Sequence, residues 1–425
     1  MNIKRCSVSD RFPYKKKLPL YFKMIRTKYF IYAAAIIIVI IYSCHKSEKP
    51  TVQKTTTTTP KDTTKTSTPS AIAYQDTIAT EWFKRDANSL GSIAFDDAFS
   101  IPLANGKVLW LTGDTYYADL NADGTTPCIF NYHNTVLQQP STSNWVQSAT
   151  TNLLTGSGSP QIFNALNINN TTNNYFWPLS GVEINGKVYI YLYKNNGATA
   201  GAPKLGILNE TTNAVDTTTV TLPPLNGINF GTSMFKVGTT IYLYGAYIVD
   251  GYGDTRVYAA QFSITGGGLT FWNGTTWSST CPDPTVNSPA VVANTLSNAL
   301  NVSYVNGKFV MIATQFLYNC DGGTAIYATA STSPTSGFGN LMNKVIYNIP
   351  DRRLGTDGKF HTPVFYSPLI HPEFTANNAF LFTYCINHYD NSIHSCNIPM
   401  CTSNETDPDD YRPRAVRVPF SVLDL

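Results

Sequence analysis

Three aspartates near one predicted hairpin are the side chains of this sequence best placed for catalysis. Asp96 and Asp97 precede an Asn-Gly turn at residues 105–106, and Asp114 follows it. An Asn-Gly pair between two apolar runs is a strong hairpin signal, because both turn residues need positive φ angles. A two-residue turn places Asp97 opposite Asp114, whereas a bulge would bring Asp96 beside Asp114 instead. Either register predicts an acidic pair at the open end of the hairpin.

Neighbouring carboxyls of this kind are suited to acid and base catalysis on a glycosidic bond. Directly opposed like charges destabilise a sheet and raise the pKa of one member of the pair. That member stays protonated near neutral pH and serves as the acid, while its ionised partner serves as the base. The alternative is structural, with one aspartate capping a turn and the other facing solvent. The sequence does not distinguish a retaining from an inverting enzyme, because these differ in the distance between the carboxyls.

The open ends of the other predicted hairpins should surround the same acidic pair. Aromatic rings there would stack on sugar rings, although each ring could equally pack between strands. The residues expected to bind substrate are Trp177, Tyr247, His371, Asn387 and His388, and Phe230, Gly231, Tyr366 and Ser367 lie at equivalent positions. Glu183 and Glu373 lie nearer the turns and rank below the aspartates, although Glu373 could still face inward.

These side chains require a scaffold that repeats one hairpin, and the sequence contains five copies of it. The predicted turns are at Asn105, Asn185, Gly238, Asn306 and Asn377. Short runs of Val, Ile, Tyr, Phe and Thr flank them, and helical patterns are nearly absent. Five units, each long enough for four strands, predict an all-β fold, a five-bladed β-propeller. A β-sandwich is the alternative, but it does not account for the fivefold repeat. Residues 78–83 and 415–422 are expected to close the ring.

The N-terminal segment differs from the rest of the chain and is typical of an exported lipoprotein. A basic region is followed by an apolar run at residues 29–42 and by Ser-Cys, which resembles a lipobox. We therefore expect residues 1–43 to be a signal peptide and Cys44 to carry a lipid. The alternative is a signal anchor, although the run is short for a membrane span. Residues 44–73 are rich in Thr and Pro and predict a disordered linker, which leaves residues 74–425 for the propeller.

The charge balance and the missing motifs exclude several classes of function. Residues 1–43 hold nine Lys and Arg and one acidic residue, so the remainder has 21 basic and 26 acidic residues and a net charge of −5. This charge argues against a nucleic-acid partner. The sequence has no GxSxG, HExxH, P-loop or dinucleotide-binding motif, which leaves nucleophilic serine, zinc and phosphate chemistry unsupported. No metal site or cofactor is predicted, and an axial calcium ion has no signature. Cys396 and Cys401 could form a disulfide.

Several segments, taken in order, resemble a family of exported bacterial proteins of unknown function that is common in Bacteroidetes. The first blade of that family resembles DDAFSIPLANGKVLWLTGDTYY. Its later blades are similar to WPLSGVEINGKVYIYLY, FGTSMFKVGTTIYLYGAY, FWNGTTW and YSPLIHPEF with FLFTYCIN, and its closing strand resembles YRPRAVRV. The resemblance covers about residues 75–422. Two departures are Thr112, in place of the usual Phe, and Asp97, where a small residue is usual.

The resemblance implies a function as well as a fold, because that family is similar to five-bladed propeller glycosidases, including endo-acting arabinanases. Their acid and base are aspartates of the first blade, which correspond here to Asp96 or Asp97 and to Asp114. The first hypothesis is therefore a lipid-anchored, monomeric glycoside hydrolase at the outer membrane or cell surface, acting on a polysaccharide. The second is a non-catalytic glycan-binding lipoprotein with the same fold, because a fold does not fix a function.

Overall fold

The computed structural model describes residues 72–127, 129–163, 175–195, 202–249, 254–315, 321–339, 341, 344–354, 358–387 and 405–425. The predicted signal peptide, the lipidation site Cys44, most of the linker, the expected sugar contact His388 and the Cys396–Cys401 pair lie outside these residues. Within them, no helix combines the length and the apolar character that crossing a membrane requires.

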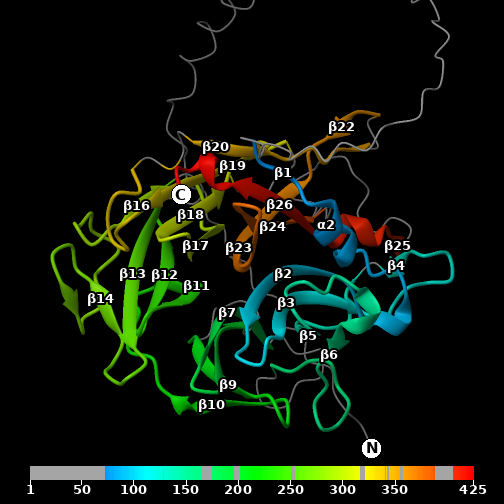
Figure 1. Ribbon diagram of the computed structural model, residues 1–425, viewed down its shortest axis with the longest axis horizontal. Coiled ribbons are helices and arrows are strands. Elements are labelled where there is room, and N and C mark those ends of the chain that lie inside the picture. Colours follow the sequence, from blue (N-terminus) through cyan, green and yellow to red (C-terminus); the bar gives the residue numbers. More distant parts are fainter. Residues whose placement is uncertain are drawn as a thin grey trace, which may run out of the picture. The chain divides into compact units, whose positions relative to one another are not determined.

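The described chain forms five antiparallel sheets arranged around a centre, as Figure 1 shows. Blade one comprises β2 (Ser92–Pro102), β3 (Val108–Tyr117), β5 (Thr135–Gln139) and β6 (Thr151–Asn152). Blade two comprises β7 (Tyr175–Ile184), β8 (Lys187–Asn195), β9 (Lys204–Asn209) and β10 (Ala214–Val220). Blade three comprises β11 (Asn229–Val237), β12 (Thr240–Ile248), β13 (Thr255–Ser263), β14 (Thr270–Trp272) and β15 (Trp277–Ser278), with β16 (Ala293–Thr295) paired to β13.

The last two blades complete the ring. Blade four comprises β17 (Leu300–Val305), β18 (Lys308–Thr314), β19 (Ala325–Ser331) and β20 (Val345–Asn348). Blade five comprises β23 (Val364–Ala376), β24 (Ala379–Asn387), β26 (Pro413–Pro419) and β1 (Tyr74–Gln75). The remaining elements are α2 (Thr77–Phe83), the pairs β4 (Thr126–Pro127) with β25 (Glu405–Thr406) and β21 (Arg353–Leu354) with β22 (Phe360–His361), and the 3-10 turns Asn88–Leu90, Gln147–Ala149, Pro408–Tyr411 and Phe420–Val422.

The predicted five-bladed β-propeller is confirmed, and each of the five predicted turns joins the first two strands of a blade. The first strands β2, β7, β11, β17 and β23 contact their neighbours in a closed ring. Positive φ angles at Asn185, Asn306 and Asn377, and at Gly238, explain why Asn and Gly occupy these turns.

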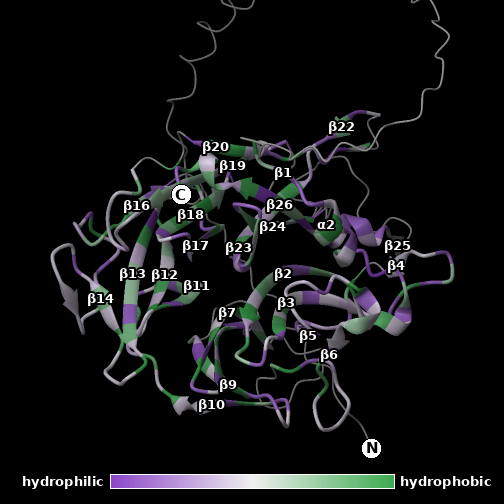
Figure 2. Ribbon diagram, in the orientation of Figure 1, coloured by the Kyte–Doolittle hydropathy of each residue, from purple (hydrophilic) through white to green (hydrophobic). Residues whose placement is uncertain are grey.

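Hydrophobic side chains fill the space between neighbouring blades and hold the ring together. One cluster joins blades one and two through residues such as Leu109 and Ile190, and similar clusters join each following pair. Figure 2 shows hydrophobic residues along the strands that surround the centre. The outermost strand β10, by contrast, alternates exposed and half-buried residues, because only one of its faces meets the rest of the molecule.

The N-terminus and the C-terminus close the propeller together, although not as the sequence predicted. Strand β26 supplies the predicted C-terminal part of the closure, and β1 pairs with it. Residues 78–83, expected to help close the ring, lie in helix α2, and the preceding Tyr74–Gln75 supplies the closing strand β1. Asp76 caps this helix, since its carboxylate accepts the Ala79 N–H at 3.0 Å. Helical spacing buries Ala79, Trp82 and Phe83 against blades one and five, which a strand would not achieve.

Candidate active site

The three aspartates come together in blade one, by a register that differs from the simple prediction. The blade-one turn is wider than two residues, since the Leu103 N–H bonds the Lys107 carbonyl. The ladder pairs Phe95 with Thr115 and then Asp97 with Thr112. The prediction that Asp97 faces Asp114 was therefore wrong. Asp96 instead lies across from residues 113–114, as expected for the bulged alternative.

The bulge is visible in the backbone of β2 itself. Asp97 has φ 60° and Ala98 has φ 118°, values that cost free energy for residues other than glycine. This irregularity turns two successive aspartates toward Gly113, where a Cβ atom would collide with the Asp96 carboxyl and lie 2.8 Å from Asp97 Oδ2. Gly113 thus leaves room for both carboxyl groups. Strained backbone that aims polar side chains at one point is typical of functional sites.

Asp114 is held by two ring N–H groups. Its Oδ1 lies 2.9 Å from His133 Nδ1 and accepts a hydrogen bond of 2.9 Å from Trp177 Nε1. Burial raises the pKa of Asp114, and the bonds from His133 and Trp177 oppose that rise. The His133 ring stacks on Tyr175, with centroids 3.4 Å apart, so its orientation is fixed. These contacts stabilise the ionised form of Asp114 against the effect of burial.

The pKa values of Asp96 and Asp97 are raised as well, and that of Asp96 is raised well above its ordinary value. Burial is the largest cause of the rise in the pKa of Asp96, followed by the charges of Asp97 and Asp114. Its Oδ2 accepts a bond of 3.1 Å from the Tyr366 hydroxyl, while its Oδ1 has no hydrogen-bond partner among the described residues. Burial also raises the pKa of Asp97 to about 6, although Ser367 donates to its Oδ1 at 2.6 Å.

Solvent access distinguishes these groups from carboxyls of the core. Asp96, Asp97 and Asp114 are each partly exposed, and the side chain of Asp114 keeps 14% of its accessible surface. Water therefore reaches the cluster, although surrounding protein atoms still dominate the pKa values. A site that is both accessible and poorly solvated is where acid and base groups can hold different protonation states near neutral pH.

The expected sugar contacts divide between this site and other places. Trp177 bonds Asp114 directly, and Asn387 bonds Tyr366, which in turn bonds Asp96. Tyr247 packs against the hydrophobic cluster between blades two and three. His371 is fully buried and bonds Ser100 and Thr383 nearer the turn end of the blades.

Sequence reasoning missed His133 and Tyr175. Tyr175 lies two residues before Trp177 on the same strand, so strand alternation could have placed both on one face. His133 lies in the loop before β5, where no strand register predicts the direction of a side chain. Among the described residues, no group of three or more His, Cys, Asp or Glu side chains is arranged to hold a metal ion.

An aromatic cavity lies beside the acidic cluster. Trp177 stacks on Tyr193 with centroids 6.1 Å apart, and Tyr193 lines a cavity of about 490 Å³. Tyr191 lines the same cavity from the same face of β8, and its buried hydroxyl has no hydrogen-bond partner among the described residues. Pro223 and Pro224 lie in its wall. Flat rings with an unpaired hydroxyl offer both stacking and hydrogen bonding to a ligand.

The raised pKa of Asp97 predicts a measurable effect on stability. The pKa of Asp97 is ordinarily 3.8 and is about 6 in the folded protein. The stability that its protonated form contributes is therefore fully present below pH 4 and is lost as pH rises through 6. An Asp97→Asn substitution should therefore raise the unfolding free energy by about 1–3 kcal/mol at pH 8 and by less at pH 4. Urea unfolding at both pH values measures this.

A matched control is Asp123→Asn. Hydrogen bonds from Thr125 lower the pKa of this exposed aspartate, so its replacement should bring no gain in stability at pH 8. Equal behaviour of the two variants would show that the surroundings of Asp97 do not disfavour its charge.

One of three similar solved structures shares the fold of this chain. A crystal structure of a candidate hydrolase from Bacteroides ovatus has 15% identity and a TM-score of 0.61, covering 81% of this chain and 89% of that one. The catalytic domain of an α-L-arabinofuranosidase from Coprinopsis cinerea gives 10% identity and a TM-score of 0.41, covering 76% and 90%. An endo-arabinase from Bacteroides thetaiotaomicron gives 13% and 0.38, covering 71% and 92%.

At 15% identity and a TM-score of 0.61, the first of these likenesses shows a shared fold and no more. No curated protein matches the sequence. A family model does match, over residues 76–420, which takes in nearly all of the propeller and the whole acidic cluster. The chain therefore belongs to the family described as a domain of unknown function, DUF5005.

Proposed function

We propose that this protein is a glycoside hydrolase that cleaves an extracellular polysaccharide with the aspartates of blade one. The observation that carries the proposal is the unequal treatment of neighbouring carboxyls. Two ring N–H groups stabilise ionised Asp114, whereas burial and two nearby charges raise the pKa of Asp96 well above its ordinary value. A pair with divergent pKa values is what acid and base catalysis requires.

The proposed chemistry assigns one role to each member of that pair. Asp96 donates its proton to the glycosidic oxygen, and the bond from that oxygen to the anomeric carbon breaks. Asp114 accepts the proton of a water molecule whose oxygen bonds the same carbon, or attacks that carbon itself before water replaces it. Asp97 does not transfer a proton in this scheme. Its charge raises the pKa of Asp96 and so keeps the acid protonated.

The aromatic cavity supports a polymeric substrate and endo-acting cleavage. The row from Trp177 to Tyr193 runs from the acidic cluster into the 490 Å³ cavity, so sugars on one side of the cleaved bond would stack there. Tyr193→Ala should raise KM for a polysaccharide by about 5- to 10-fold, because one ring contact contributes about 1 kcal/mol. The kcat should change by less than about twofold.

A control for this experiment is Tyr304→Ala, which removes a half-buried tyrosine from blade four, away from the row. It should leave KM unchanged. If both variants alter KM alike, or if Tyr193→Ala alters only kcat, the cavity does not bind the substrate chain.

The extracellular setting belongs to the same proposal and rests on the sequence. Residues 1–43 would direct export, and a lipid on Cys44 would tether the propeller at the outer membrane or cell surface as a monomer. Cys44→Ala should then move the protein out of the membrane fraction. Retention of that variant in the membrane would instead indicate a signal anchor.

The direct test of hydrolysis is release of new reducing ends from a panel of polysaccharides that includes arabinan, xylan and galactan. Release by the wild-type protein and none by an Asp114→Asn variant is the expected result. Binding of a polysaccharide without any release would favour a glycan-binding lipoprotein, the alternative that the same aromatic surface allows.

A further inference from the structure

A second and larger cavity lies at the other end of the propeller axis. It measures about 650 Å³ and is lined by the first strands of all five blades, mostly by residues nearer the hairpin turns. Residues 100–104 of blade one border it, whereas Asp96 and Asp97 lie further along the same strand, toward the open end. The hairpin turn at residues 185–186 also borders it. This cavity is therefore separate from the proposed catalytic site.

Glu373 is the group in this cavity that most needs a partner. Its Oε1 is buried and has no hydrogen-bond partner among the described residues. Burial raises the pKa of Glu373 to about 7, although a hydrogen bond with Ser100 opposes the rise. An unpaired carboxyl oxygen in such surroundings costs free energy, which a ligand that donates a hydrogen bond would recover.

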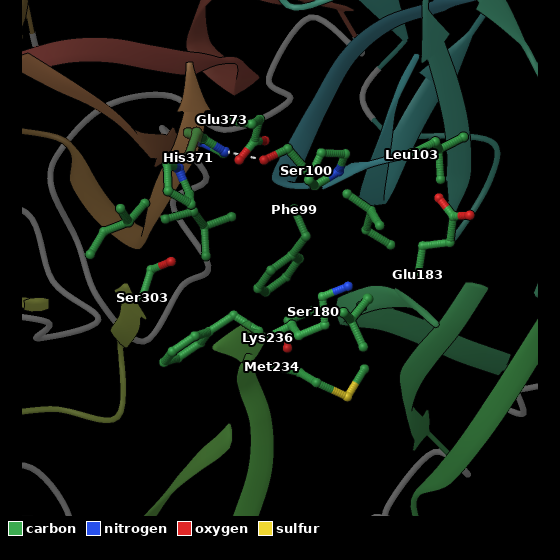
Figure 3. Close-up of a pocket in the computed structure, with 18 of the residues that line it drawn as sticks. Phe99, Ser100, Leu103, Ser180, Glu183, Met234, Lys236, Ser303, His371 and Glu373 are labelled. Atoms are coloured by element: carbon green, nitrogen blue, oxygen red, sulfur yellow. Dashed lines mark hydrogen bonds between the residues drawn. The ribbon is translucent and has the colours of Figure 1, made fainter. Parts of the chain in front are cut away.

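On its other side, the Glu373 carboxyl bonds Ser100, the first of three side chains joined by hydrogen bonds. Ser100 Oγ lies 2.6 Å from His371 Nδ1, and His371 Nε2 lies 2.9 Å from Thr383 Oγ1. Figure 3 shows Ser100, His371 and Glu373 close together at one wall of the cavity. Burial lowers the pKa of His371 to about 3, so the imidazole is neutral. His371 and Thr383 therefore orient Ser100 without adding a positive charge that could pair with Glu373.

The remaining polar groups of the cavity differ in charge and lie on separate walls. The side chains of Lys236 and Ser303 have no hydrogen bond to another described side chain, and Glu183 uses one oxygen to accept the Ala104 N–H. Phe99 and Met234 contribute apolar surface between them. An anion would meet two carboxyls here, and an apolar molecule would leave Glu373 unpaired. Hydroxyl groups, which both donate and accept, suit Glu373 in either protonation state.

We propose that this cavity binds a small, neutral, polyhydroxylated molecule of mono- or disaccharide size, held by a hydroxyl that donates to Glu373. Its volume lies within the range of about 300–1,000 Å³ that is usual for small-molecule sites. Because residues from all five blades line this cavity, it is a preformed pocket rather than a surface patch. This site stands independently of the proposed hydrolase activity, since it shares no residue with the acidic cluster.

Calorimetric titration with xylose, cellobiose and glucosamine tests the proposal. It is run on an otherwise unchanged protein carrying Trp177→Ala, so that sugar binding beside Asp114 is weakened. At least one neutral sugar should bind with one-to-one stoichiometry. Adding Glu373→Leu should weaken that binding at least about tenfold, whereas Glu373→Gln, which keeps a hydrogen-bonding group, should weaken it less than about threefold.

Several results would overturn the assignment. These are no binding of either neutral sugar, equal affinity in the Glu373→Leu variant, and tighter binding of cationic glucosamine than of the neutral sugars. If Glu373→Leu does not fold, Ser303→Ala replaces it and should weaken binding about threefold. Glu373→Leu in the wild-type background should hydrolyse polysaccharide normally. Loss of sugar binding at this cavity and loss of the proposed activity at Asp114 are thus measured separately.

Discussion

Asp114→Asn should reduce polysaccharide hydrolysis by at least about 10³-fold while the protein stays folded. The amide has the shape of the carboxylate, so its oxygen can still accept from Trp177 Nε1 and His133 Nδ1, which lie 2.9 Å away. It cannot accept a proton from water or attack the anomeric carbon. The loss should therefore appear in kcat, with little change in KM. Steady-state release of reducing ends, with unfolding curves for both proteins, measures this.

The matched control for Asp114→Asn is His133→Gln, which removes one stabilising partner and keeps the carboxylate. Because His133 lowers the pKa of Asp114, its loss should move the acidic limb of the rate profile to higher pH without abolishing activity. Full activity of Asp114→Asn would contradict its assignment as base. Unfolding of that variant would show that the aspartate is structural.

Asp96→Asn should produce the second large loss, and its size should depend on the leaving group. Hydrolysis of a polysaccharide should fall about 10³-fold, because its alkoxide leaving group needs a proton. An aryl glycoside of the same sugar with an acidic phenol should lose less than about tenfold. The alkaline limb of the wild-type profile, where activity falls as Asp96 loses its proton, should disappear in this variant. Equal losses on both substrates would argue against Asp96 as the acid.

The Asp97→Asn variant distinguishes the role of Asp97 from that of Asp96. The charge of Asp97 raises the pKa of Asp96, so removing it should lower that pKa and move the alkaline limb to lower pH. Activity at the optimum should fall by no more than about tenfold, since Asp97 transfers no proton. If Asp97→Asn instead shows the leaving-group dependence expected of Asp96→Asn, the roles of the two aspartates are exchanged.

The hairpin repeat made the fold predictable from the sequence. Asn185, Asn306 and Asn377 occupy backbone positions with positive φ, a requirement that few residue types satisfy, so their recurrence marked the blades. Helix α2 escaped prediction because seven residues carry little periodic signal. Its burial against Trp110, whose ring centroid lies 5.3 Å from that of Trp82, is a tertiary effect.

The site was less predictable than the fold for reasons of local geometry. A wider turn and a bulge at Asp97 shifted the register of blade one, and neither follows from residue types alone. Spacing identified the acidic cluster, because all three aspartates lie on one hairpin. His133, by contrast, comes from a loop, and its stacking on Tyr175 depends on how blade one meets blade two. Residues contributed by loops require the assembled structure.

If the carboxyls of blade one cleave a glycosidic bond with water, the oxygen of that water enters the product. Hydrolysis in ¹⁸O-labelled water, followed by mass spectrometry of the released oligosaccharides, measures this transfer. The wild-type protein should place one ¹⁸O atom at each new anomeric end of at least one polysaccharide, and Asp114→Asn should release no labelled product. A wild-type protein that binds the polysaccharides and leaves every one of them intact would contradict the proposed hydrolase activity.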